Sequence, residues 1–165
     1  MNRILTLFPW AGGLFISAIF LDSLRFKFTG HLTPQHIFTT LRDWSGIGLF
    51  YPAGPWIIGL GELLSSLLLI ALPVIFLLSE RKKLIAPSQF LGALIAIGIM
   101  SGAISFHLFT PLGIETPVEW DDTVPTKFSG ALFYSACMSW LLAAGILFIH
   151  RGAISPIMGL ISKAK

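Results

Sequence analysis

Glu62 is the residue whose position most strongly suggests chemistry, because it interrupts an otherwise uncharged apolar stretch at residues 55–79. A carboxylate inside hydrocarbon costs about 2.5 kcal/mol or more unless it is paired, protonated or hydrated, so such residues are functional hypotheses by default. The carboxylate can relay a proton, hold a ligand, or form an ion pair that fixes the register of two helices. The residue alone leaves function and structure equally open.

Lys27 and His107 are the natural partners of Glu62, since each stands at the end of another apolar stretch. Lys27 offers an ammonium for an ion pair. The imidazole of His107 can transfer a proton, ligate, or simply make a hydrogen bond. Asp22 and Arg25 are three residues apart, the spacing at which they pair with each other on a helix.

A metal site is a weaker alternative. His31 and His36 are five residues apart, which is not typical of metal ligands on one element. Combining them with His107 and Glu115 leaves such a site open, but we expect no metal. Cys137 is the single cysteine, so an intrachain disulfide is excluded.

The composition places these residues in a membrane protein. Of the 165 residues, 55% are hydrophobic and 12% charged, against about 25% charged in soluble domains. Four stretches reach the length of about 20 apolar residues that a transmembrane helix needs: residues 4–25, 55–79, 87–108 and 128–150. We therefore predict one all-α membrane domain over residues 1–165, a four-helix transmembrane bundle.

The distribution of Lys and Arg predicts the orientation of the bundle. With both termini inside, the inner side carries seven cations: Arg3, Arg81, Lys82, Lys83, Arg151, Lys163 and Lys165. The outer side carries four: Arg25, Lys27, Arg42 and Lys127. We expect both termini in the cytoplasm, in a bacterial inner membrane. Whichever way the chain inserts, its connectivity brings Lys27, Glu62 and His107 to the same side.

The connections have their own signals. Thr33 is a good N-cap and Pro34 suits the first position of a helix over residues 34–44. Its apolar stripe predicts a short interfacial helix or lid, although an ordinary connector is the alternative. Residues 109–127 are acidic, and we expect a solvated loop. Gly98 and Gly102 form a small-x-x-x-small pair, which predicts close packing against a neighbouring helix.

The motifs "FKFTG", "HIFTTL", "GLGELLSSLLLI", "GALIAIGIMSGAISFHL" and "LGIE", in this order, resemble DoxX-like membrane proteins over nearly the whole chain. That family is built as four-helix membrane bundles and is named for the small subunit of an archaeal thiosulfate:quinone oxidoreductase. Many members are thought to be accessory subunits of membrane redox or assembly systems. The resemblance implies a polar pocket formed by Lys27, Thr29, Glu62, His107 and Glu115. Secondary candidates at its rim are Asp22, Arg25 and His31.

The leading functional hypothesis is an accessory or ligand-binding subunit of a quinone-linked redox system. A quinone headgroup could accept a hydrogen bond from His107 or Lys27 and take a proton relayed through Glu62. A non-enzymatic scaffold or assembly factor and a small carrier are the alternatives, and no complete catalytic motif decides whether the protein is an enzyme. Expected partners are the lipid bilayer, a membrane or periplasmic protein and a second copy of the chain, but not nucleic acid, because the cations lie at the ends of apolar runs.

Overall fold

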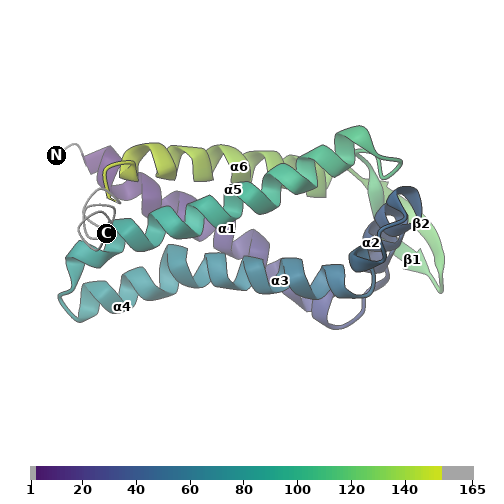
Figure 1. Cartoon of the computed structure of the whole chain (residues 1–165), viewed down its shortest axis with the longest axis horizontal. Coiled ribbons are helices and arrows are strands. Elements are labelled where there is room, and N and C mark those ends of the chain that lie inside the picture. The colour runs from purple at the N-terminus through teal and green to yellow at the C-terminus, as the bar shows by residue number, and fades with distance from the viewer. Residues whose placement is uncertain (1–2, 154–165) are drawn as a thin grey trace, which may run out of the picture.

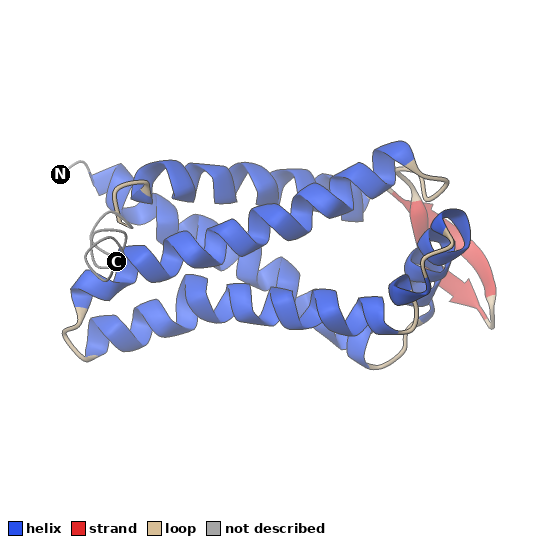
Figure 2. Cartoon of the chain, in the orientation of Figure 1, coloured by secondary structure: helices blue, strands red, loops and turns tan. Residues whose placement is uncertain are grey.

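The computed structural model describes residues 3–153. Four long helices run side by side, and a small cap lies across one end of them (Figures 1 and 2). In chain order the elements are α1 (Arg3–Phe28), α2 (Leu32–Ser45), η1 (Gly48–Phe50), α3 (Ala53–Ser66), the π-helical turn η2 (Leu67–Ala71), α4 (Leu72–Leu78), η3 (Lys82–Leu84), α5 (Ile85–Phe109), β1 (Thr116–Asp121), β2 (Val124–Ser129) and α6 (Ala131–His150).

The four predicted spans are confirmed as helices long and apolar enough to cross a membrane: Leu5–Phe28, Ala53–Leu78, Lys82–Phe109 and Ala131–His150. The second is continuous through η2. Both α1 and α5 pack against α3 and against α6, so the four helices form a closed ring. Large apolar side chains such as Leu14 and Leu78 point away from this ring and stay exposed, which suits lipid as the surrounding solvent.

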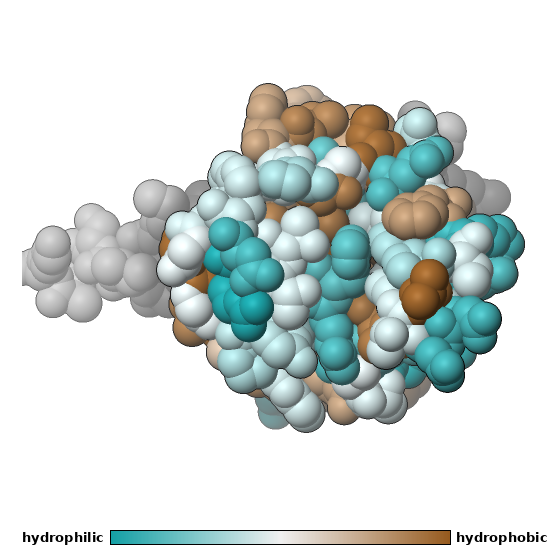
Figure 3. All heavy atoms as spheres, turned by 90° about the vertical axis from the view of Figure 1, so that its right-hand side faces the viewer, coloured by the Kyte–Doolittle hydropathy of each residue, from teal (hydrophilic) through white to brown (hydrophobic). Residues whose placement is uncertain are grey.

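The two ends of the bundle differ in charge and covering (Figure 1). At the basic end, α1 begins, α6 ends, and the turn between α4 and α5 holds Arg81, Lys82 and Lys83. At the cap end, α2 and the β1–β2 hairpin lie across the helix ends. Viewed from the cap end, the surface is largely polar, with apolar side chains gathered along one edge (Figure 3). Lys163 and Lys165, used to predict the topology, lie outside the described residues.

Helix α2 confirms the helix predicted for residues 34–44, but its N-cap is His31, not Thr33. The Nδ1 atom of His31 accepts a hydrogen bond from the backbone N–H of Thr33 at 3.2 Å. The helix therefore starts at Leu32, two residues earlier than the Thr-Pro signal indicated. Pro34 still falls in the first turn, where no intrahelical partner for an N–H exists. Gly46 ends the helix in the left-handed conformation, φ 72°, and its N–H donates to the carbonyl of Arg42.

The acidic loop expected at residues 109–127 is wrong in part, because an antiparallel hairpin forms there and the fold is not entirely helical. Asp121 faces Val124 across a two-residue turn, and Asp122 takes a positive φ of 49° that Asp tolerates better than most residues. Glu119 lies opposite Lys127, and their charged groups are 2.6 Å apart. The acidic residues favoured a loop in the sequence, but the exposed Glu119 and Asp121 alternate with the half-buried Val118 and Trp120, as on a strand with one covered face.

The turn η2 shows how the apolar interior accommodates a proline. Pro73 has no N–H, so a carbonyl group one turn before it loses its helical donor. Two side chains of α5 donate to carbonyls of this turn: Ser88 Oγ donates to that of Leu68 at 2.7 Å, and Gln89 Nε2 donates to that of Leu69 at 3.4 Å. Backbone groups far from water thereby keep partners.

Glycines on α5 differ in how closely their surroundings pack. A Cβ on Gly92 would lie 2.9 Å from Leu69 Cγ and 3.0 Å from the Leu69 backbone nitrogen, so this face does pack closely. The prediction for Gly98 and Gly102 is wrong. A Cβ on Gly98 would meet nothing within 4 Å, and one on Gly102 would meet only the Phe106 ring at 4.0 Å.

Candidate functional site

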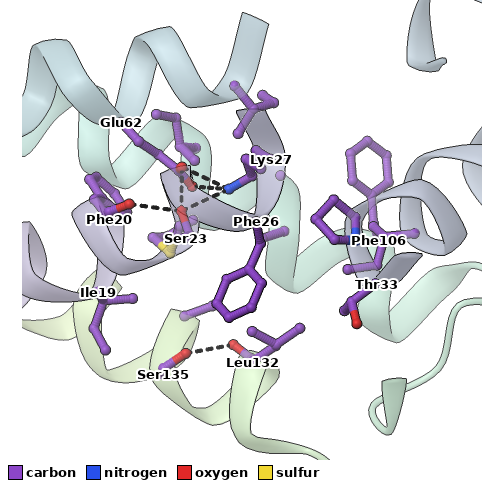
Figure 4. Close-up of a pocket in the computed structure, with 18 of the residues that line it drawn as sticks. Ile19, Phe20, Ser23, Phe26, Lys27, Thr33, Glu62, Phe106, Leu132 and Ser135 are labelled. Atoms are coloured by element: carbon purple, nitrogen blue, oxygen red, sulfur yellow. Dashed lines mark hydrogen bonds and ion pairs between the residues drawn. The ribbon is translucent and has the colours of Figure 1, made fainter. Parts of the chain in front are cut away.

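A cavity of about 500 Å³ lies inside the cap-end half of the bundle (Figure 4). All four long helices contribute to its walls, and the lining is mostly apolar. Pro34, Phe38 and Leu41 of α2 and Val118 of β1 also line it, so the cap covers the cavity at the end of the bundle. Gly98 and Gly102 belong to the lining, which explains why no helix packs against that face.

One wall of the cavity carries a buried ion pair. Lys27 Nζ lies 2.6 Å from Glu62 Oε1 and 2.7 Å from Oε2, so one ammonium bridges both carboxylate oxygens. The side chains are 13% and 4% exposed respectively. The predicted partnership of Lys27 and Glu62 is confirmed, and it removes the net charge that would otherwise stand in an apolar interior.

Ser23 completes this polar cluster. It stands four residues before Lys27, on the same face of α1, and Lys27 Nζ donates to its hydroxyl at 3.1 Å. The single hydroxyl proton of Ser23 has two acceptors within reach, Glu62 Oε2 at 2.7 Å and the Phe20 carbonyl at 2.8 Å. All three ammonium protons of Lys27 are therefore used inside the cluster, on Glu62 and Ser23.

Close contact between α1 and α3 positions this cluster. Phe28 stacks on Trp56 with ring centroids 4.7 Å apart. A Cβ on Gly59 would lie 2.6 Å from the Phe28 ring, so glycine is the residue that allows this approach. Gly59 precedes Glu62 by three residues, and the helices are thereby held where Lys27 reaches the carboxylate.

His107 lines the same cavity but does not bond to Glu62. Its Nδ1 lies 2.6 Å from the carbonyl oxygen of Gly113, in the loop that follows α5. The side chain is buried, with 6% of the residue exposed, and its ring meets Phe133 edge-on at 5.8 Å. The expectation that His107 pairs directly with the carboxylate is therefore wrong.

The remaining predicted residues separate into two groups. Asp22 and His31 line the cavity, and Asp22 also makes the expected exposed ion pair with Arg25, at 3.0 Å. Thr29 and Glu115 do not line it. The hydroxyl of Thr29 donates to the Arg25 carbonyl, and Glu115 is exposed in the loop before β1.

Sequence reasoning named Thr33 only as an N-cap and missed its role in joining the two parts of the cap. Its hydroxyl donates to the Pro117 carbonyl at 2.9 Å and accepts from Trp120 Nε1 at 3.0 Å, joining α2 to β1. No local signal could reveal a partner more than 80 positions away. His36 lies beside the Trp120 ring, with centroids 5.9 Å apart, and burial lowers its pKa below the ordinary value of 6.5.

Residues 3–153 contain no group of three or more His, Cys, Asp and Glu side chains that could hold a metal ion. No protein-family model, curated protein or solved structure matches the chain. The class of protein therefore follows from its architecture, an integral membrane helix bundle with an internal cavity under a cap. The resemblance to DoxX-like proteins stays a prediction.

Proposed function

We propose that the protein binds a small amphipathic molecule of the quinone class in this cavity and serves as an accessory subunit of a membrane redox system. The cavity itself carries the proposal. Its volume falls within the range of about 300–1,000 Å³ that is usual for small-molecule sites. Apolar walls suit a ring and the start of a tail, while the Lys27–Glu62 pair and His107 supply polar contacts at defined points.

The orientation of the site in the membrane belongs to the same proposal. Arg81, Lys82 and Lys83 stand in the shortest connection between two of the long helices, at the basic end, and the preference of such charges for the cytoplasm supports an outward-facing cap. In a bacterial inner membrane, the ligand would then lie in the outer half of the bilayer.

Binding of a decyl-chain benzoquinone to the protein in lipid nanodiscs tests this function. Ala103 lines the cavity, so Ala103→Phe places a ring in the ligand's space, and we expect at least a tenfold loss of affinity. Ala18→Phe is the matched control, because Ala18 is exposed on α1 and does not line the cavity. No saturable binding by the native protein, or equal binding by both variants, would contradict the proposal.

A second candidate is a non-enzymatic scaffold or assembly factor, in which the ion pair only joins α1 to α3. The complete use of the Lys27 ammonium protons inside the cluster favours it. This alternative predicts that gently solubilised protein carries no stoichiometric small molecule in native mass spectrometry. It also predicts that Ala103→Phe stabilises the bundle, since the ring would fill empty space.

A further inference from the structure

The hydrogen bond of His107 determines which of its nitrogens carries a proton. A carbonyl oxygen can only accept, so the 2.6 Å contact with Gly113 requires the proton on Nδ1. In the neutral ring, Nε2 then presents a lone pair and no proton. His107 therefore accepts a hydrogen bond at the cavity and does not donate one, contrary to the role first expected for it.

This lone pair has no protein partner. Nε2 makes no hydrogen bond to any residue within 3–153, although the side chain is more than nine-tenths buried and lines the cavity. This lone pair is therefore free to accept a hydrogen bond from a donor that a bound molecule brings.

The polar cluster of Lys27, Ser23 and Glu62 on α1 and α3 also has an unused acceptor and no unused donor. The ammonium protons of Lys27 and the hydroxyl proton of Ser23 already have acceptors within the protein. Glu62 Oε1 accepts only from Lys27, so this carboxylate oxygen keeps a free lone pair. The Lys27–Glu62–Ser23 cluster and His107 thus have acceptor capacity to spare and no spare donor. In a neutral His31 ring, whose Nδ1 accepts from the Thr33 N–H, the proton is instead on Nε2, so this residue of the lining is a donor.

We propose that the cavity prefers the reduced, dihydroxy form of an aromatic headgroup, a hydroquinone, over the oxidised quinone. Hydroquinone hydroxyls donate, and they match the lone pairs of His107 and Glu62. At His107 and Glu62, quinone carbonyl oxygens, which have only lone pairs, would face lone pairs on the protein. The inference rests on the proposed function and adds the redox state of the ligand to it; it requires binding alone and no electron transfer.

The test compares the dissociation constants of a decyl-chain benzoquinone and the corresponding benzoquinol, both measured anaerobically on the protein in nanodiscs. We expect the benzoquinol to bind at least tenfold more tightly, which would raise the midpoint potential of the bound two-electron couple by about 30 mV. Equal affinities, or tighter binding of the benzoquinone, would overturn this inference and leave the proposed function intact. Binding of neither form would overturn both.

The variant His107→Asn removes the acceptor Nε2 but keeps the hydrogen bond to the Gly113 carbonyl. The asparagine amide keeps an N–H donor near the position of Nδ1 for the Gly113 carbonyl but has no atom where Nε2 stood. We expect the ratio of the two affinities to fall toward one, with little change in benzoquinone binding. His36→Asn is the matched control, because His36 lies on the cap and does not line the cavity. Full retention of the preference in His107→Asn would show that Nε2 is not the acceptor.

Discussion

The two halves of the bundle use the same four helices in opposite ways. Near the basic end, glycines admit large neighbours: a Cβ on Gly145 would lie 2.6 Å from the Phe8 ring, and one on Gly12 would touch Ile146 at 3.4 Å. In the cap-end half, Gly98 and Gly102 border open space. Gly59 on α3 still admits the Phe28 ring in the cap-end half, so the small residues that leave room for a ligand are those on α5.

Polar groups divide in the same way. In the basic-end half, Ser88 and Gln89 donate to backbone carbonyls in the turn before Pro73, and His150 Nε2 bonds to Gln89 Oε1 at 3.0 Å. Those side chains complete the structure. In the cap-end half, His107 keeps a lone pair without a protein partner. The comparison teaches that an intramembrane polar residue indicates a ligand when its unused hydrogen-bonding capacity also faces a cavity; the buried hydroxyls of Ser17 and Ser139 lack partners within residues 3–153 but do not line one.

The largest expected effect is on the free energy of unfolding, when the ion pair of the cap-end half is broken. Glu62→Leu leaves the Lys27 ammonium buried without its carboxylate, and we expect a loss of about 3–5 kcal/mol in the free energy of unfolding. Reversible unfolding in SDS–lipid mixtures measures it. The double variant Lys27→Met/Glu62→Leu removes both charges and should recover most of the loss.

Asp22→Asn provides the control for this prediction, because it breaks an exposed ion pair on α1, the helix that carries Lys27. Its effect should stay within about 1 kcal/mol, as for exposed pairs in general. A Glu62→Leu variant as stable as the native protein would show that the cluster is not a structural ion pair.

The contrast between glycines predicts an intermediate effect. Gly92→Ala forces a methyl group against the Leu69 backbone, so the helices must separate, and we expect a loss of about 1–3 kcal/mol. Gly98→Ala adds the same methyl group to open space, and the helix-forming preference of alanine should make it neutral or stabilising by up to about 1 kcal/mol. Thermal unfolding of the two variants side by side checks this. Equal losses would mean that both halves are packed alike.

The smallest effect concerns the cap and its pH dependence. Burial lowers the pKa of His36 below 6.5, so the neutral ring is favoured while the cap is closed. As pH falls through 6.5, the opened cap takes up a proton more readily than the closed one, so closure weakens until pH drops below the lowered pKa. Hydrogen exchange of α2 amides from about pH 8 to about pH 5 measures this. In His36→Gln the pH dependence of cap closure should largely vanish. An unchanged pH dependence in this variant would mean that another group causes it.

The sequence by itself determined the number and placement of the spans, because each depends on a local run of apolar residues. It also determined that Lys27, Glu62 and His107 lie toward one end, since alternating helix directions leave no other arrangement. The Lys27–Glu62 pair was predictable on this ground, as was the exposed pair of Asp22 and Arg25.

Only the tertiary structure decided which polar atoms are used and which are free. The tautomer of His107 depends on Gly113, and the bonds of Thr33 depend on β1, because hydrogen bonds join groups by position in space. The prediction for Gly98 was wrong for the same reason. Spacing along a helix shows that one face carries small residues, but whether a neighbouring helix packs against that face depends on the positions of the other three helices. The cavity, which is the space left between elements, has no sequence signal of its own.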